Sequence, residues 1–249
     1  MARTLLVRGL VAGALAGILA FAFALVFGEP QIDKAIAFEE SLAAAAGAPA
    51  EPELVSRATQ STIGLLTGTV VMGVALGAIF AIAFAWAYGR VGALGARATA
   101  ALLALGAFAA ITLVPSTKYP ANPPTVGDPD TIDRRTLLFV AMIAISVLAA
   151  LAAARLWRQL APRLGGWNAA IAAGLLFAAV VAVAELLLPA VHETPKGFPP
   201  DLLWQFRLAS IGLNATLWLA IGLGFGALAE RVLEPAAARP APARTAARA

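Results

Sequence analysis

Residues 63–88 read IGLLTGTVVMGVALGAIFAIAFAWAY, a run of apolar and small residues without a charged side chain. About 20 such residues in a helix cross the hydrocarbon core of a bilayer. Similar runs recur along the chain, and they predict membrane spans at residues 5–27, 63–88, 98–114, 136–154, 168–189 and 208–229. The predicted fold class is therefore all-α, a polytopic membrane helical bundle of about six transmembrane helices.

The composition supports a membrane protein and excludes several kinds of site. Of 249 residues, 61% are hydrophobic and 13% are charged, against roughly 45–50% and about 25% in soluble domains. There is no cysteine and one histidine, His192, which excludes disulfides, thiolate metal sites and zinc sites with several histidine ligands. No P-loop motif occurs, and no acid–base set can be assembled. The sequence thus predicts a protein that is not an enzyme.

The distribution of charge predicts the topology. If the N-terminus is inside, the inside segments are short and rich in arginine, whereas the outside segments are longer and rich in acids. This asymmetry favours a multi-pass protein of the bacterial cytoplasmic membrane with both termini inside. The net charge of +4 is attributed to this topology and not to nucleic-acid binding. Residues 1–233 form the predicted membrane domain, and the Pro/Ala/Arg-rich tail 234–249 is expected to be disordered in the cytoplasm.

The first apolar run has an alternative interpretation. Arg3 and Arg8 accompany its start, as in a signal peptide. The run is longer than a usual signal-peptide core, and Glu29-Pro30 makes a poor cleavage site. A retained helix is therefore favoured.

Glycines recur at four-residue spacing within three of the predicted spans, which places small residues on one helix face and allows backbones to approach closely. Such faces could bind a partner subunit or could pack within one bundle, and the second interpretation is favoured. The glycines are Gly9, Gly13 and Gly17, then Gly64 and Gly68, Gly73 and Gly77, and Gly222 and Gly226.

The three outer loops resemble one another. Each ends with a proline and an acid followed by an arginine: Pro52-Glu53 and Arg57, Pro129-Asp130 and Arg134, and Pro200-Asp201 and Arg207. The pattern suggests three tandem helical hairpins around an axis near the membrane normal. Convergent helix capping explains it equally well, because acids stabilise helix N-termini.

Two outer segments could cover the end of the bundle. Residues 31–42 form a candidate amphipathic helix, which would lie on the outer leaflet or fold over the mouth of the bundle. Residues 118–130 contain several prolines, which favour a rigid cap or a simple connector.

Acidic residues on the outer side are candidate ligands for a divalent metal ion. Glu185 is the only acid inside a predicted span, and an ionisable residue there is a functional candidate by default. Together with other outer residues it would offer oxygen and nitrogen ligands for a hard or borderline cation. The alternative is that these groups are solvated or paired with arginine. The candidate set is Glu185, His192, Glu193, Glu29, Asp33, Glu39 and Glu40.

Several stretches spread over residues 4–232 resemble the CbtA family of proposed cobalt transporter subunits. The family is described with about five predicted spans, against six here. The matching stretches are LVRGLVAG at 6–13, FGEP at 27–30, AIAFEE at 35–40, LVP at 113–115, KYPANPP at 118–124, GDP at 127–129, GFP at 197–199 and FRLAS at 206–210.

The resemblance implies a membrane subunit for uptake of cobalt(II), the expected transported ion, with no permanently bound cofactor. It also implies a small partner subunit, CbtB, that supplies a histidine-rich metal-binding end. The lipid bilayer is the other expected partner, and a homo-oligomer remains open. The alternative function is a non-transporting scaffold or accessory subunit that binds a partner membrane protein through the glycine-rich helix faces.

Overall fold

The structure, a computed structural model, describes residues 2–47, 54–90 and 92–234. In this part of the chain every regular element is a helix. The prediction of an all-α membrane bundle is therefore confirmed. Pro52, Glu53 and residues 235–249 of the predicted disordered tail lie outside the described residues. Among the described residues, five helices are long and apolar enough to cross a membrane, at 2–45, 57–87, 96–118, 129–187 and 200–233.

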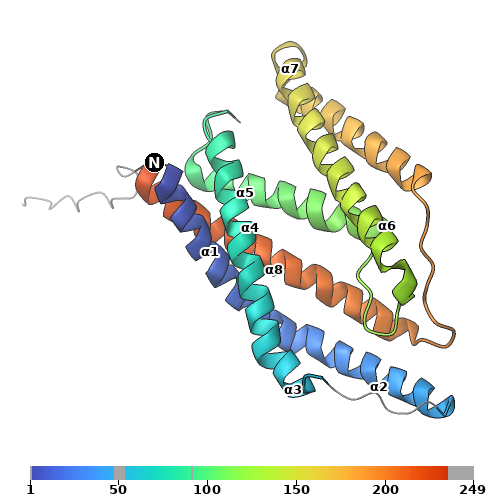
Figure 1. The fold of residues 1–249 in the computed structure, drawn as a ribbon. Helices are drawn as coiled ribbons and strands as arrows, with labels where there is room; N and C mark the ends of the chain where they lie inside the picture. Colours follow the sequence, from blue (N-terminus) through green and yellow to red (C-terminus); the bar gives the residue numbers. More distant parts are fainter. Residues whose placement is uncertain (1, 48–53, 91, 235–249) are drawn as a thin grey trace, which may run out of the picture.

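The longest helix, α7 (Ile132–Leu187), bends back on itself at Gly165. Gly165 has φ 77° and ψ 159°, a conformation that residues with a Cβ rarely adopt. The two arms of α7 run in opposite directions (Figure 1). The bend separates the predicted spans 136–154 and 168–189, and the total of about six spans stays a prediction. The predicted connection between 154 and 168 is itself helical up to the bend.

The first helix is also longer than predicted, because the chain does not leave the helix at Phe27. The α-helix α1 (Ala2–Phe23) passes through a π-helical turn, η1 (Ala24–Gly28), into α2 (Glu29–Ala45). Pro30, at the start of α2, cannot donate the backbone hydrogen bond that a helix interior requires. The π turn immediately before Pro30 has a wider hydrogen-bonding pattern, which accommodates the missing N–H without ending the helix.

The same arrangement occurs in the third long helix. Here α5 (Ala96–Ala107) continues through the π turn η3 (Phe108–Leu113) into α6 (Val114–Lys118), and Pro115 lies in the first turn of α6. The hydroxyl of the fully buried Ser146 on α7 donates a hydrogen bond to the Ala110 carbonyl within η3. The π turn therefore also supplies a backbone acceptor that joins α7 to the bundle.

The core lies where α1, α5, α4 (Leu65–Ala87) and α8 (Pro200–Leu233) meet. A third π turn, η2 (Gln60–Gly64), joins α4 to the short α3 (Arg57–Thr59). Alanines line much of the core, and the large side chains in it are mostly aromatic. The rings of Phe84 and Phe225, both fully buried, meet edge to face with centroids 4.9 Å apart. Helix α1 packs extensively on α4 and α8, as expected for a retained helix.

The glycine-rich faces are mostly used inside the chain. A Cβ on Gly13 would lie 2.8 Å from the carbonyl carbon of Gly73, and Gly9 and Gly77 are apposed in the same way. Gly222 likewise faces Ala104 on α5. The predicted packing within one bundle is therefore confirmed for these positions. Gly68, by contrast, has no heavy atom within 4 Å of its Cβ position.

The three predicted hairpins do not pack equivalently. Helices α1 and α4 form a close pair, but α8 packs on α1 and α5 and not to a comparable extent on α7. Among the described residues, α7 meets the rest of the bundle mainly at η3 and α6. The similar loop sequences are therefore not accompanied by a threefold repeat of packing.

The connections segregate to two ends of the bundle. The N-terminus, the α4–α5 turn, the α7 bend and the end of α8 lie at one end, here called the basic end (Figure 1). Helix α2 and the connections 119–131 and 188–199 lie at the other, here called the acidic end (Figure 1). This is the alternation that the charge distribution predicts, and the direction of insertion remains a prediction.

Polar contacts fasten the helices at the basic end. The Glu234 carboxylate accepts hydrogen bonds from the Tyr88 hydroxyl at 2.8 Å and from the Ala96 backbone N–H at 2.7 Å. It thereby caps the N-terminus of α5, whose unpaired N–H groups attract an anion. Arg97 on α5 also pairs with Glu230 on α8 at 2.7 Å. Helices α4, α5 and α8 are thus tied together where the chain leaves the bundle.

At the acidic end, α2 packs on the two long connections and on the start of α8. Its buried Ala35 packs with Val126 and Phe198 from the two long connections and with Leu202 on α8. Phe38 adds an edge-to-face contact with Phe198, with ring centroids 5.1 Å apart. The two predicted positions for residues 31–42, on the outer leaflet or over the mouth of the bundle, stay predictions.

Candidate functional site

A cavity of about 460 Å³ opens at the acidic end. Five segments form its walls: the η3–α6 helix, the connection 119–131, the first turns of α7, the connection 188–199 and residues 207–214 of α8. The Pro-rich connection 119–131 therefore serves as a wall of a cavity. Its prolines restrict the backbone, which helps to hold this wall in one shape.

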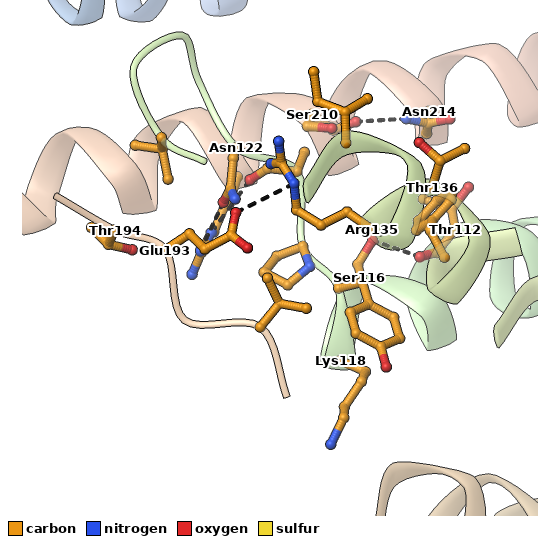
Figure 2. A pocket seen from close by; sticks show the side chains of 18 of the residues that line it. Thr112, Ser116, Lys118, Asn122, Arg135, Thr136, Glu193, Thr194, Ser210 and Asn214 are labelled. Atoms are coloured by element: carbon orange, nitrogen blue, oxygen red, sulfur yellow. Dashed lines mark hydrogen bonds and ion pairs between the residues drawn. The ribbon is translucent and has the colours of Figure 1, made fainter. Parts of the chain in front are cut away.

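The cavity has a charged side and an uncharged polar side. Figure 2 shows Glu193, Arg135 and Asn122 gathered on one side, with hydroxyl and amide side chains opposite. Lys118 also lines the cavity, but its ammonium group points away from these residues (Figure 2). The uncharged polar side chains of the lining are Thr112, Ser116, Asn122, Thr136, Thr194, Ser210 and Asn214.

Glu193 joins three segments around the cavity. Its carboxylate accepts hydrogen bonds of 2.9 Å from the Asp128 backbone N–H and from the Thr131 hydroxyl. The same oxygen, Oε2, lies 3.4 Å from Nε of Arg135 on α7. Because these partners are 58 or more positions away in the sequence, Glu193 fixes the connection 188–199 to the connection 119–131 and to α7.

The guanidinium of Arg135 occupies space that a glycine leaves open. Gly127 has φ 125°, and a Cβ on it would collide with the guanidinium of Arg135. Nη2 of Arg135 donates to the Asp128 carbonyl at 3.2 Å. Nε is buried beside Oε2 of Glu193, its ion-pair partner. Nη1 makes no hydrogen bond in the described part of the chain, so Arg135 keeps donor capacity there.

Arg207 on α8 enters the cavity with only uncharged partners. It donates to the Ala121 carbonyl at 3.4 Å and to Oδ1 of Asn122 at 3.0 Å. Within the described residues, no carboxylate oxygen lies within 4.0 Å of its guanidinium nitrogens. Its positive charge is thus not neutralised by an ion pair.

The seven predicted metal ligands fall at separate places along the acidic end. Glu29 and Asp33 both pair with Arg57, with Asp33 at 3.0 Å. Glu39 accepts a hydrogen bond of 3.2 Å from the Thr125 hydroxyl, and Glu40 is exposed. These four residues therefore line α2 without forming one cluster.

The other three candidates lie near the end of α7, with Glu185 in its last turn and His192 and Glu193 in the connection that follows. The Glu185 carboxylate accepts a hydrogen bond from Thr117, and its backbone carbonyl accepts one of 2.6 Å from Lys118. His192 is exposed, and Glu193 alone lines the cavity. In the described ranges, no three histidine, aspartate or glutamate side chains meet in a group that could hold a metal ion. Ligation by these residues remains a prediction.

The two arginines that line the cavity were not among the predicted site residues. Arg207 entered the predictions only as part of the loop pattern, and Arg135 did not enter them. A usable signal was present, because arginines follow two Pro-rich outer connections that also contain Gly127 and Gly197. What the sequence does not show is that the two connections face each other.

Acidification is expected to loosen these connections through Glu193. The Asp128 N–H foremost, and then Thr131, Arg135 and Arg134, lower the pKa of the Glu193 carboxyl below its ordinary value of 4.5, while burial acts in the opposite direction. The pKa of Glu193 is thus lower in the folded protein than in the unfolded chain. The stability that ionised Glu193 contributes to the fold is therefore complete well above pH 4.5 and is lost as the pH falls through the lowered pKa. Thermal unfolding followed between pH 7 and pH 3 checks this.

The Glu193→Gln variant is compared with the parent protein, because it removes the titrating carboxyl and keeps the size and shape of the side chain. We expect the parent to be more stable than the variant at pH 7, with the difference disappearing at the lowest pH. An undiminished difference at pH 3 would show that Glu193 does not act through its charge.

Comparison with protein families gives one match. The model of a family described as "Probable cobalt transporter subunit (CbtA)" matches residues 2–230. This range includes all five long helices almost in full, as well as the whole cavity lining. No match was found among curated proteins or among solved structures.

Proposed function

We propose, because this chain belongs to the CbtA family of probable cobalt transporter subunits, that it forms a pathway for uptake of divalent cobalt across the bacterial cytoplasmic membrane. The observation that carries the proposal is the family match over a bundle of membrane-length helices. The proposed orientation places both termini in the cytoplasm and the acidic end outside.

The acidic end supports this direction of movement. Carboxylates such as Glu39, Glu40 and Asp33 lie on α2 at the acidic end, and a surface of one sign of charge raises the local concentration of counter-ions. The chain has no P-loop motif, so we propose that the membrane potential supplies the energy. An inside-negative potential favours cation entry by about 2.3 kcal/mol per charge per 100 mV.

The proposed route begins at the cavity. Beyond the arginines, its uncharged side offers hydroxyl and amide oxygens from Thr112, Ser116 and Asn214. Asn214 donates its amide N–H to the Ser210 carbonyl of its own helix at 2.9 Å, which leaves Oδ1 as an acceptor. Such neutral oxygens suit a hydrated divalent ion. A histidine-rich partner subunit is proposed as the source of firmer ligands, and a homo-oligomer stays a second proposal.

The scaffold alternative has less support. Gly9, Gly13, Gly73 and Gly77 face one another within the chain, so these positions offer no free surface to a partner. Gly64 and Gly68 are exposed but form only one short segment of α3–α4.

The test is cobalt flux into liposomes that contain the purified chain, with and without an inside-negative potential. We expect potential-dependent entry, reduced at least about tenfold by Asn214→Leu, which corresponds to about 1.4 kcal/mol in the barrier. Thr216→Val is the matched control, because Thr216 lies on the same helix, makes the same kind of bond to its own backbone and does not line the cavity. Absence of entry through folded, inserted protein would contradict a pathway within this chain.

A further inference from the structure

We propose that the cavity at the acidic end binds an oxyanion, a carboxylate or phosphate group, between Arg135 and Arg207. The inference goes beyond the proposed function, since it assigns a ligand class to the cavity whether or not the chain conducts cobalt. Both arginines line the cavity and come from different helices, α7 and α8.

The charge of the lining favours an anion. Arg135 and Arg207 face a single carboxylate, Glu193, and that carboxylate is close only to Arg135. Arg207 has only the Ala121 carbonyl and the Asn122 amide oxygen as partners. A guanidinium remains charged at any pH that a folded protein experiences. The cavity therefore holds one positive charge that no side chain among the described residues compensates.

The donors of the two arginines are largely unused. A guanidinium has five N–H groups in a planar fork that matches the oxygens of carboxylate and phosphate. Arg135 makes one hydrogen bond in the described part of the chain, through Nη2, and its Nε lies beside the Glu193 carboxylate. Arg207 makes two, to the Ala121 carbonyl and to Oδ1 of Asn122, so each arginine has N–H groups to spare. An oxyanion in the cavity would accept hydrogen bonds from these groups.

Neighbouring side chains extend the donor set. Asn122 turns its Oδ1 toward Arg207, which leaves the amide NH2 group to donate. The Ser210 hydroxyl on α8, one turn below Arg207, also lines the cavity. An anion held by two arginines, an amide and a hydroxyl would have donors on several sides, which is the usual form of an oxyanion site.

An oxyanion could reach the cavity from either of two sources. A small carboxylate or inorganic phosphate could enter from the water outside the membrane, either alone or bound to a metal ion. The phosphate of a lipid headgroup could enter from the neighbouring leaflet, because Arg135 and Arg207 directly precede the predicted spans 136–154 and 208–229. If cobalt follows this route, it would pass the two arginines most easily in the company of such an anion.

The test is a titration of the full chain, purified in a maltoside detergent that contains neither phosphate nor carboxylate. Citrate and inorganic phosphate are added at pH 7 in a calorimeter. In a separate arm, native mass spectrometry compares retention of phosphatidylglycerol with retention of an uncharged glycolipid. We expect saturable binding of at least one of these oxyanions, weakened at least about tenfold by Arg207→Gln.

Lys196→Gln is the matched control, because it removes the same charge from an exposed residue that does not line the cavity and should leave binding unchanged. The Arg207→Lys variant keeps the positive charge but loses the planar set of guanidinium N–H donors, so it should bind the oxyanion with intermediate strength. Failure of all the oxyanions to bind, or equal binding by the parent and Arg207→Gln, would overturn the inference. Oxyanion binding that persists while cobalt flux fails would overturn the proposed transport and support this inference.

Discussion

Replacing Gly13 by leucine is expected to remove most of the folded protein. A Cβ on Gly13 would lie 2.8 Å from the carbonyl carbon of Gly73 and 3.1 Å from the Cα of Gly77. Both are backbone atoms, so no side chain can rotate away. The reciprocal contacts are equally close, because a Cβ on Gly73 would lie 2.9 Å from the backbone nitrogen of Gly17. Helices α1 and α4 would have to separate along their whole interface.

The expected cost is about 3 kcal/mol or more, at the upper end of overpacking effects, because neighbouring glycine contacts would be lost together. Thermal unfolding and the yield of monodisperse protein in detergent measure it. Gly68→Leu is the matched control, since Gly68 lies on α4 with no heavy atom within 4 Å of its Cβ position, and it should be tolerated. Equal stability of the Gly13 and Gly68 variants would show that α1 and α4 do not pack as described.

Replacing Arg57 by alanine is the second change with a large expected effect. Arg57 pairs with Glu29 and Asp33 at the place where α2 follows the π turn η1. The Glu29 side chain is only 10% exposed, whereas that of Asp33 is 63% exposed. Removing the arginine leaves the Glu29 carboxylate nearly buried without its counter-charge. We expect a loss of about 3 kcal/mol, the lower part of the range for broken buried pairs, because Arg57 itself is partly exposed.

A double-mutant cycle separates this effect from lost packing. Glu29→Gln in the Arg57→Ala background removes the uncompensated charge and should recover much of the lost stability, as measured by thermal unfolding. Asp33→Asn in the same background is the control, and it should recover little because Asp33 is solvated. If the Glu29 substitution restores nothing, the arginine acts through its apolar stem and not through its charge.

The spans were predictable because helices in a bilayer must satisfy their own backbone groups, and this requirement leaves long apolar runs in the sequence. The positions of the helix ends were not predictable from the sequence. Gly28 and Pro30 resemble a stop signal, but the π turn lets the helix continue into α2. The arginines between residues 154 and 168 favoured a loop between two spans. Arginine is also a good helix former, and the helix continues through this segment until it bends at Gly165.

The candidate site was predictable only in part. Glu193 was selected because it is acidic and lies beside a span, and it does line the cavity. Its partner Arg135 and the uncompensated Arg207 could not be deduced, because their positions depend on how the connections 119–131 and 188–199 fold against each other. Glu29 and Asp33 were grouped with the other acids, but each is held by Arg57, and no sequence periodicity relates residues on separate helices.

The placement of α8 against α1 has a consequence for how the protein is made. The ribosome produces α1 before α8, yet the two pack extensively and are joined by a hydrogen bond from Arg8 to the Leu228 carbonyl. Contacts between such distant parts of a chain form late. The pair of α1 and α4 can assemble during translation, whereas the faces of α1 and α5 that receive α8 stay open to lipid until α8 has been made. A chain truncated before α8 would therefore leave these faces unfilled.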